Sequence, residues 1–178
     1  MGTVLSEAAF PSVVAVFPCQ VQWGDCDPAG IIFYPTYFRW MDSACWSMFA
    51  AAGYDAKRMR AESLAMPLVS ADCQFLYPAE QGDRCAVHSR ILQFGGKSFV
   101  VAHEVTREDG MALAKGSETR GWGKFESGPG SRLRGQIIPD GITLLLAELS
   151  GAQEVLAVET RAGGLAAHVR ARDRVALA

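Results

Sequence analysis

The chain has 178 residues, of which 49% are hydrophobic, enough for one domain with a single core but not for two packed domains. With 17 basic against 19 acidic residues, it lacks the excess of positive charge that favours nucleic-acid binding. No apolar run is long enough to cross a bilayer, and residues 1–10 do not follow the pattern of a signal peptide, so we expect a cytoplasmic protein that acts away from membranes.

The elements can be predicted in chain order from the hydrophobic pattern. Residues 13–23 are apolar enough for a strand, and Pro18, which has no N–H, indicates an edge or a bulge. Over residues 37–52, apolar side chains recur at helical spacing and predict one long amphipathic helix, which Gly53 ends. Residues 69–77 alternate between apolar and polar side chains, so we expect a strand with one buried face.

A second short helix is predicted near residues 56–62. Three further strands are predicted at residues 85–94, 98–107 and 111–125, and the short segments between them indicate antiparallel hairpins. One strand, a long helix and then four strands is not an alternating order, so an α+β fold is favoured over a doubly wound parallel sheet. The helix should pack against the apolar face of the sheet.

The C-terminal part has a weaker pattern. Residues 137–149 are expected to form a short helix. We therefore expect a single domain over residues 1–149, with its core at about residues 12–126. Residues 150–178 are predicted to form a mobile or loosely helical tail.

The five cysteines form no Cys-x-x-Cys pair, and Cys45 and Cys73 lie on apolar faces of the expected elements. This pattern is typical of buried thiols in a reducing compartment, so we expect neither a disulfide nor a zinc site. The segment that begins at Asp25 matches a calcium loop only in part. Ala29 and Thr36 stand where such a loop has an oxygen ligand and a glutamate, so no metal site is expected.

The most informative segment is Trp23-Gly24-Asp25-Cys26-Asp27-Pro28-Ala29-Gly30, a turn with two carboxylates shortly before the long helix. Amides in the first turn of a helix have no intrahelical acceptor, and the helix dipole is positive there, so they stabilise an oxygen that gains negative charge. Asp27 is able to attack, or to activate water against, a carbonyl held by such amides. In the structural alternative, Asp27 makes an Asp-Pro turn and caps the following helix. Asp25 is expected to be a structural hydrogen-bonding partner of the turn.

Gly24-Asp25-Cys26-Asp27-Pro28-Ala29-Gly30-Ile31, continued through Tyr34-Pro35 to Arg39-Trp40-Met41-Asp42, closely resembles the 4-hydroxybenzoyl-CoA thioesterase family of the hot-dog superfamily. Weaker similarity extends through Lys97-Ser98-Phe99-Val100 and Arg132-Leu133-Arg134 to about Leu146. The resemblance implies a hot-dog fold, in which a curved antiparallel five-stranded sheet wraps a long central helix. It also implies subunits that pair as a homodimer or homotetramer, with sites at their interface.

By this resemblance, Asp27 is the catalytic carboxylate, as nucleophile or as general base, and the backbone N–H of Tyr34 polarises the thioester carbonyl. An apolar, aromatic acyl pocket is implied as well. Tyr37 and Trp40 are its candidates on the helix, and Asp42 is placed to meet a ring substituent.

Coenzyme A carries phosphates, and similar proteins bind its nucleotide end with basic side chains. Lys97, Arg132 and Arg134 fall on matching positions. Gly95 and Gly96 stand where the resemblance leads us to expect arginines, which implies a different arrangement of nucleotide recognition.

The expected activity is hydrolysis of an aromatic acyl-CoA thioester, with 4-hydroxybenzoyl-CoA as the leading candidate, in aromatic degradation. Other aryl or short-chain acyl-CoA thioesters are the nearest variants. Coenzyme A is part of the substrate, and no further cofactor is expected. A hydratase of the same fold needs a histidine with a carboxylate, yet no histidine lies near the motif, and His88 and His103 fall within strands, where a structural role is expected. A noncatalytic module that binds acyl-CoA is a third possibility. It is disfavoured because a negative charge at Asp27 does not help to bind a polyanion.

Overall fold

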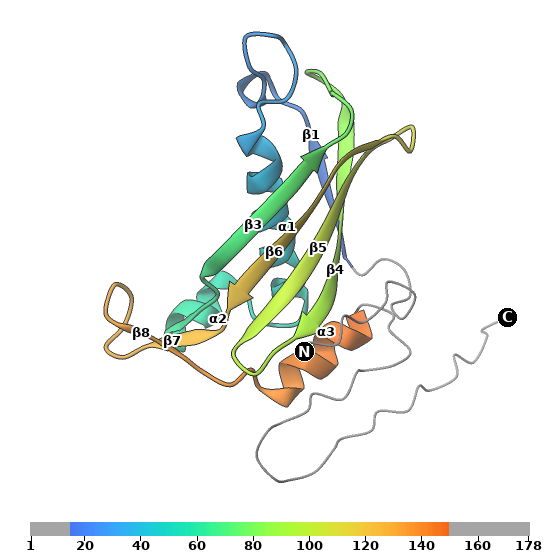
Figure 1. Ribbon diagram of the computed structural model, residues 1–178. Coiled ribbons are helices and arrows are strands. Elements are labelled where there is room, and N and C mark those ends of the chain that lie inside the picture. Colours follow the sequence, from blue (N-terminus) through green and yellow to red (C-terminus); the bar gives the residue numbers. More distant parts are fainter. Residues whose placement is uncertain (1–14, 150–178) are drawn as a thin grey trace, which may run out of the picture.

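A computed structural model describes residues 15–149, in which a five-stranded antiparallel sheet curls around the long helix α1 (Pro35–Ala51) (Figure 1). The predicted tail, and the first two residues of the predicted first strand, lie outside the described residues. The sheet has the strand order β1-β4-β5-β6-β3. The α+β architecture with one sheet around one long helix is therefore confirmed.

The strands of this sheet are β1 (Ala15–Gln20), β3 (Leu68–Phe75), β4 (Arg84–Phe94), β5 (Ser98–Arg107) and β6 (Ala112–Gly121). The hairpins β4–β5 and β5–β6 confirm the predicted short connections. Strand β1 ends earlier than predicted, because Trp23–Asp25 form a short 3-10 helix, η2. Pro18 lies in this edge strand, as predicted, where a missing N–H is tolerated.

A second, three-stranded sheet was not predicted. It contains β2 (Leu64–Ala65), β7 (Gly123–Phe125) and β8 (Leu133–Gly135). The single strand predicted at residues 111–125 is wrong, because β6 and β7 belong to different sheets and meet at Trp122. The Trp122 side chain is buried against Phe49 of α1 and anchors the change of direction.

Helix α1 packs closely on the sheet because β6 has a glycine, Gly116, at the point of contact. A Cβ on Gly116 would lie 3.0 Å from Cε of Met41, which is on α1, and 2.4 Å from the carbonyl oxygen of Asp72 on β3. Nothing larger than hydrogen fits there, so helix and sheet approach closely at this point. The helix ends two residues before Gly53, as predicted.

The two short helices occur close to where they were predicted. Helix α2 (Ala56–Ala61) begins after Asp55, whose carboxylate accepts a 2.8 Å hydrogen bond from the N–H of Arg58. Helix α3 (Asp140–Leu149) is anchored in the core by Ile142. Within residues 15–149, no helix combines the length and the apolar character needed to span a lipid bilayer.

The predicted buried face of residues 69–77 is wrong for the single chain. Strand β3 is at the edge of the sheet, and its apolar residues Val69 and Phe75 are exposed, Val69 to 67%. Helix α1 packs mainly against β1 and β4, and it meets β3 near its own start, where Tyr37 and Phe38 contact the Phe75 ring. The apolar residues of β3 are therefore only partly covered within residues 15–149, and Val69 is left exposed.

Candidate active site

The Asp27 loop is a tight turn closed by backbone hydrogen bonds. The N–H of Gly30 donates to the carbonyl of Asp27, and the N–H of Asp27 donates to the carbonyl of Ile31, each at 2.9 Å. Pro28 supplies the φ that the second position of such a turn needs, and Gly30 takes the left-handed conformation with φ +82°. The predicted turn is confirmed, and its shape follows from these local residues.

The Asp27 carboxylate is half-buried and lightly bonded. Its Oδ1 accepts a 2.8 Å hydrogen bond from the N–H of Ala29, and this is its only hydrogen bond to any residue of 15–149. Helix α1 begins instead after Tyr34 and has no side-chain cap. The structural alternative is therefore right about the turn and wrong about the helix cap. Asp27 Oδ2 has no protein partner in the described part of the chain.

Asp25 holds the loop to the helix. Its buried carboxylate accepts a 2.8 Å hydrogen bond from the N–H of Gln22 and forms an ion pair with Arg39 of α1. Its carbonyl accepts hydrogen bonds from the N–H of Phe33, at 2.8 Å, and from Oγ1 of Thr36, at 3.3 Å. The structural role expected for Asp25 is confirmed.

A free backbone donor lies at the start of α1. The N–H of Phe33 bonds to Asp25, the N–H of Thr36 bonds to the carbonyl of Phe33 at 2.9 Å, and Pro35 has no N–H. The remaining amide, that of Tyr34, has no acceptor among residues 15–149. Helix N-termini also carry partial positive charge, so this N–H can donate to an oxygen that gains negative charge.

The aromatic candidates of α1 are in the core. Tyr37 and Trp40 are buried with their ring centroids 6.0 Å apart, and burial raises the pKa of Tyr37 to about 12. Exposed rings adjoin them. The centroid of Phe75 is 5.4 Å from that of Tyr37 and 6.3 Å from that of Tyr34, and Phe33 is 5.1 Å from Tyr34. Sequence reasoning missed Phe33 and Phe75, since contacts between a loop and a distant strand leave no local signal.

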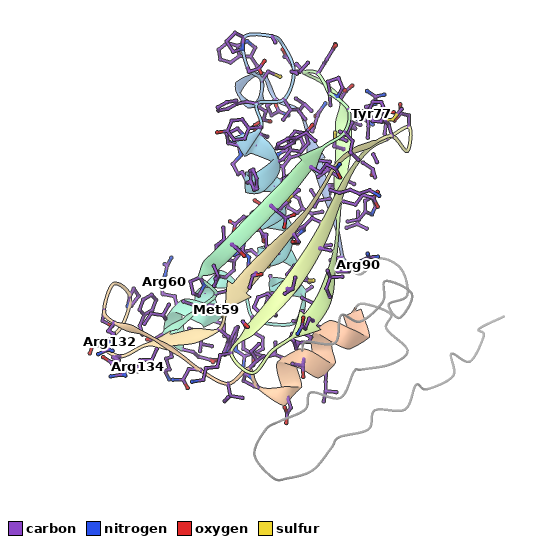
Figure 2. The ribbon with its side chains drawn as sticks, viewed as in Figure 1. Met59, Arg60, Tyr77, Arg90, Arg132 and Arg134 are labelled. Carbon is purple, nitrogen blue, oxygen red and sulfur yellow. The ribbon has the colours of Figure 1, made fainter. Side chains whose placement is uncertain are left out.

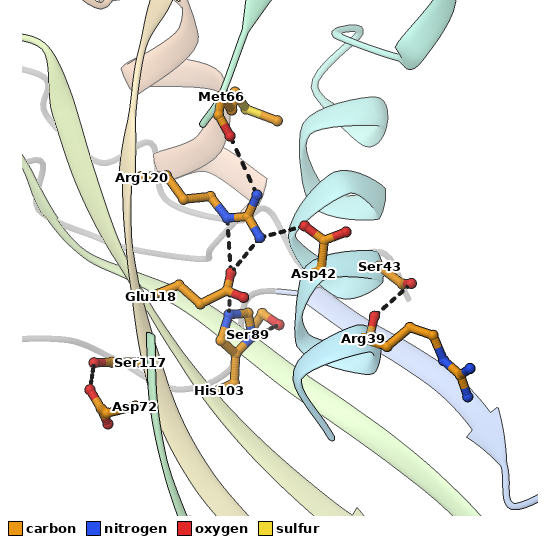
Figure 3. A network of polar contacts seen from close by, with 10 residues as sticks. All are labelled: Arg39, Asp42, Ser43, Met66, Asp72, Ser89, His103, Ser117, Glu118 and Arg120. Atoms are coloured by element: carbon orange, nitrogen blue, oxygen red, sulfur yellow. Dashed lines mark hydrogen bonds and ion pairs between the residues drawn. The ribbon is translucent and has the colours of Figure 1, made fainter. Parts of the chain in front are cut away.

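Asp42 is half-exposed on α1 and is bound by a buried cation (Figure 3). Its Oδ1 accepts a 2.6 Å hydrogen bond from Nη2 of Arg120. Arg120 also contacts Glu118, which faces His103. The buried position of His103 agrees with the structural role expected for it, but its connection to Asp42 through Glu118 and Arg120 could not be predicted from sequence.

The expected coenzyme-binding residues gather around the second sheet. Lys97 precedes β5, and its Cδ is 3.3 Å from the position a Cβ would take on Gly135 of β8. Arg134 lies in β8 itself, and Figure 2 shows Arg132 and Arg134 side by side at this end of the molecule. The structure therefore brings together all three predicted basic residues.

One further cation of this group was missed. Lys124 lies opposite Arg134 in the register of β7 and β8 and is exposed. Arg134 also pairs with Glu126, so part of its charge is already compensated. A second sheet had to be recognised before Lys124 could be placed here.

The Asp27 loop and this basic group lie at opposite ends of the folded domain (Figure 1). Helix α1 runs between them, and its 17 residues correspond to about 25 Å. A ligand that contacts both groups within one chain would have to span that length.

Thiols and metals offer no obvious alternative chemistry in the described residues. Burial raises the pKa of Cys45 to about 12 and that of Cys85 to about 11, so both are protonated at neutral pH and are poor nucleophiles. All five cysteines are free. Within residues 15–149, no cluster of His, Cys, Asp and Glu side chains is arranged to hold a metal ion.

Comparison with known proteins agrees with this geometry. A family model described as the thioesterase-like superfamily matches residues 21–139. The chain is 32% identical over 127 residues to a 4-hydroxybenzoyl-CoA thioesterase of Pseudomonas sp. (strain CBS-3), which covers 67% of this chain and 88% of that relative.

Two solved structures are similar along most of their length. A gentisyl-coenzyme A thioesterase has a TM-score of 0.64 and 32% identity, covering 71% of this chain and 98% of that one. A mutant 4-hydroxybenzoyl CoA thioesterase, complexed with 4-hydroxybenzoyl CoA, has a TM-score of 0.67 and 28% identity, covering 74% and 96%. The protein therefore belongs to the thioesterase-like superfamily and is a thioester hydrolase with the hot-dog fold.

Proposed function

We propose that the protein hydrolyses an aromatic acyl-CoA thioester, and that Asp27 and the backbone N–H of Tyr34 carry the reaction. One observation supports this above the others. Among residues 15–149, Asp27, a carboxylate with a partner-free oxygen, comes seven positions before Tyr34, whose amide has no acceptor and lies at the start of the long helix. A nucleophile or base near a free oxyanion donor is the combination that acyl transfer requires.

The chemistry needs few groups. A thioester carbonyl is already electrophilic, and its leaving thiol has a pKa of roughly 8.5 if cysteine is a fair proxy, so no strong general acid is required. Asp27 attacks the carbonyl or activates a water molecule, and the Tyr34 N–H stabilises the oxyanion. Such a donor is worth on the order of 3 kcal/mol in the transition state. No cofactor takes part, since coenzyme A is the leaving group.

The acyl group we favour is 4-hydroxybenzoyl, with other aryl or short-chain groups as alternatives. The three thioesterases compared above carry 4-hydroxybenzoyl or gentisyl groups in their names, and both are groups of hydroxylated aromatic acids. Tyr37 and Trp40 form the aromatic backing of the proposed pocket. Asp42 presents a carboxylate oxygen that is able to accept a hydrogen bond from a ring hydroxyl.

Coenzyme A binding is proposed at Lys97, Arg132 and Arg134, whose charges suit its phosphates. Because these residues lie far from Asp27 within one chain, we propose that a second copy supplies them to each site. The partly exposed apolar edge strand β3, with Val69 exposed, supports a homodimer or homotetramer, since exposed apolar edge strands favour pairing with another chain. The oligomer would then be the catalytic unit.

A hydratase is disfavoured by the position of the only histidine–carboxylate contact among residues 15–149. His103 lies 3.4 Å from Glu118, but both side chains are fully buried between helix and sheet. A substrate cannot reach either group without disrupting the core. A noncatalytic binding module remains an outcome of the experiment below.

The test is thiol release from a panel of aryl- and alkyl-CoA thioesters by the wild type and by Asp27→Asn. Asparagine can still accept the Ala29 hydrogen bond, so the turn is kept while the negative charge is removed. We expect turnover of at least one aryl thioester, and a loss of several orders of magnitude in the variant with binding retained. Asp55→Asn, at a helix cap that asparagine also suits, is the matched control. Equal rates in wild type and Asp27→Asn would contradict the proposal, and binding without any turnover would favour the binding module.

A further inference from the structure

A buried cation lies beneath α1. The Arg120 side chain, on β6, is 2% exposed, and its Nε and Nη2 lie 2.9 and 2.8 Å from Oε2 of Glu118 (Figure 3). Its Nη1 faces the carbonyl of Met66 at 3.5 Å. Arg120 and Glu118 are two positions apart on one strand, so both point from the sheet toward the helix.

A histidine supports this pair from the next strand. His103 of β5 is opposite Gly116 in the β5–β6 register. Gly116 is two residues before Glu118 on β6, so His103 and Glu118 lie on the same face of the sheet. Its Nδ1 is 2.8 Å from Oγ of Ser89, while its Nε2 lies 3.4 Å from Oε2 of Glu118 without a well-aligned hydrogen bond. If the Ser89 hydroxyl donates to Nδ1, the ring proton is on Nε2 and faces the carboxylate.

These contacts keep Glu118 charged inside the protein. Burial raises the pKa of the Glu118 carboxyl, but His103 and the Arg120 guanidinium more than offset this, so its pKa lies below the usual value. A buried carboxylate held in this way fixes the Arg120 guanidinium in one orientation. The Nη2 atom of Arg120, held by Glu118, is the atom that also binds Asp42.

Asp42 is the one member of this network that solvent reaches. Its side chain is 51% exposed, yet Oδ1 is held by Arg120 at 2.6 Å. Its second oxygen, Oδ2, has no partner among residues 15–149 and points away from Arg120 in Figure 3. An exposed aspartate would otherwise sample several rotamers, so the buried cation turns it into an acceptor of fixed position.

We propose that Arg120 is a positioning residue that holds Asp42 so that its free oxygen accepts a hydrogen bond from a hydroxyl on the substrate ring, and thereby sets the preference for hydroxylated over unsubstituted aryl thioesters. This inference rests on the proposed aryl thioesterase function. A site built to accept a hydroxyl disfavours the analogue that lacks one, because the acceptor is then left without a partner. A misplacement of about 1 Å can cost about 100-fold in rate.

The experiment compares kcat/KM for 4-hydroxybenzoyl-CoA with kcat/KM for benzoyl-CoA. The ratio of the two is measured for the wild type, Arg120→Lys, Asp42→Asn and the double variant. We expect each single substitution to lower the ratio by about tenfold or more, the size of one charge-assisted hydrogen bond. The double variant should match Asp42→Asn, because Arg120 acts through Asp42. Arg107→Lys, which alters a partly exposed arginine paired with Asp109, is the control and should leave the ratio unchanged.

If Arg120 had a purely structural role, Arg120→Lys would lower kcat/KM for both substrates alike and leave their ratio unchanged. An unchanged ratio in folded Arg120→Lys therefore overturns the inference. Additive effects in the double variant would overturn it as well. If Arg120→Lys does not fold, Asp42→Glu moves the carboxylate by one methylene at a half-exposed position, and an unchanged ratio there is equally decisive. A wild type that hydrolyses neither aryl thioester refutes the proposed function itself, whereas aryl turnover without a hydroxyl preference refutes only this inference.

Discussion

Replacing Tyr34 by proline removes the proposed oxyanion donor and leaves the protein's own backbone hydrogen bonds intact. The φ of Tyr34 is −50°, within the range of about −65 ± 15° that the proline ring imposes. Its N–H has no acceptor among residues 15–149, so no hydrogen bond of the described fold is lost. We therefore expect the free energy of unfolding to change by no more than about 1 kcal/mol.

The effect on catalysis should be far larger. Removing one oxyanion donor typically costs about 100- to 1000-fold in kcat, or about 3 to 4 kcal/mol. Because the donor acts mainly on the charge that develops in the transition state, kcat should fall much more than KM changes. Tyr34→Ala is the matched control, because it removes the same exposed ring and keeps the N–H.

The assay is thiol release under single-turnover conditions for both Tyr34 variants, with thermal unfolding to show that each is folded. The quantity of interest is the ratio of the alanine rate to the proline rate, since the loss of the ring cancels. A ratio near one, with both variants folded, would refute the assignment of the donor to Tyr34. A large ratio with unchanged stability would be hard to explain by any group other than this amide.

Three further outcomes are expected. Val69→Lys places a charge at an exposed apolar position of β3 and should shift the protein toward monomers in light scattering, whereas an unchanged mass would argue against β3 as the interface. Gly116→Ala puts a Cβ 2.4 Å from the carbonyl oxygen of Asp72 and should cost about 1–3 kcal/mol in urea unfolding, while Gly141→Ala, in open space, should not destabilise the protein. The pKa of Glu118 is lowered in the folded state, so the charged carboxylate stabilises the folded protein. This contribution to the free energy of unfolding is complete above the unfolded pKa of about 4.3 and is lost as pH falls through the folded pKa. Unfolding of Glu118→Gln should thus depend less on pH in that acidic range.

Features governed by neighbouring residues could be predicted from the sequence. The turn at Asp27 depends on Pro28 and Gly30, both inside it, and the end of α1 is marked by Gly53 close by. Each of these signals acts over a few positions, where the conformational preferences of proline and glycine decide the geometry. The α+β order follows in the same way from the sequence of periodicities.

Features that depend on distant parts of the chain were predicted less well. Alternation along β3 correctly gave a strand, but it could not tell whether α1 or another surface covers the apolar face. The break between β6 and β7 was missed, and Gly121 and Gly123 on either side of Trp122 were the only local signs of it. A side-chain period reports which face a residue occupies, not which sheet the strand joins.

The network beneath Asp42 was missed for a related reason. Arg120 and Asp42 are 78 positions apart, and nothing near either residue specifies the other. The only local sign is a glutamate and an arginine two positions apart in β6, Glu118 and Arg120. Two opposite charges on the inward face of a strand are costly unless they are paired, so such a pattern deserves to be interpreted as a buried ion pair in other sequences.

The two carboxylates of the loop show how environment separates identical side chains. Asp25 is buried, pairs with Arg39 and accepts the N–H of Gln22, so both of its oxygens are engaged in holding the loop to α1. The Asp27 carboxylate accepts only the N–H of Ala29 and keeps one oxygen without a partner in residues 15–149. Carboxylate oxygens that already accept hydrogen bonds are less available to attack a carbonyl or to bind a water molecule. The same loop therefore contains a structural carboxylate and one that is left available for chemistry, and Asp25 ties this loop to Phe33, the residue before Tyr34.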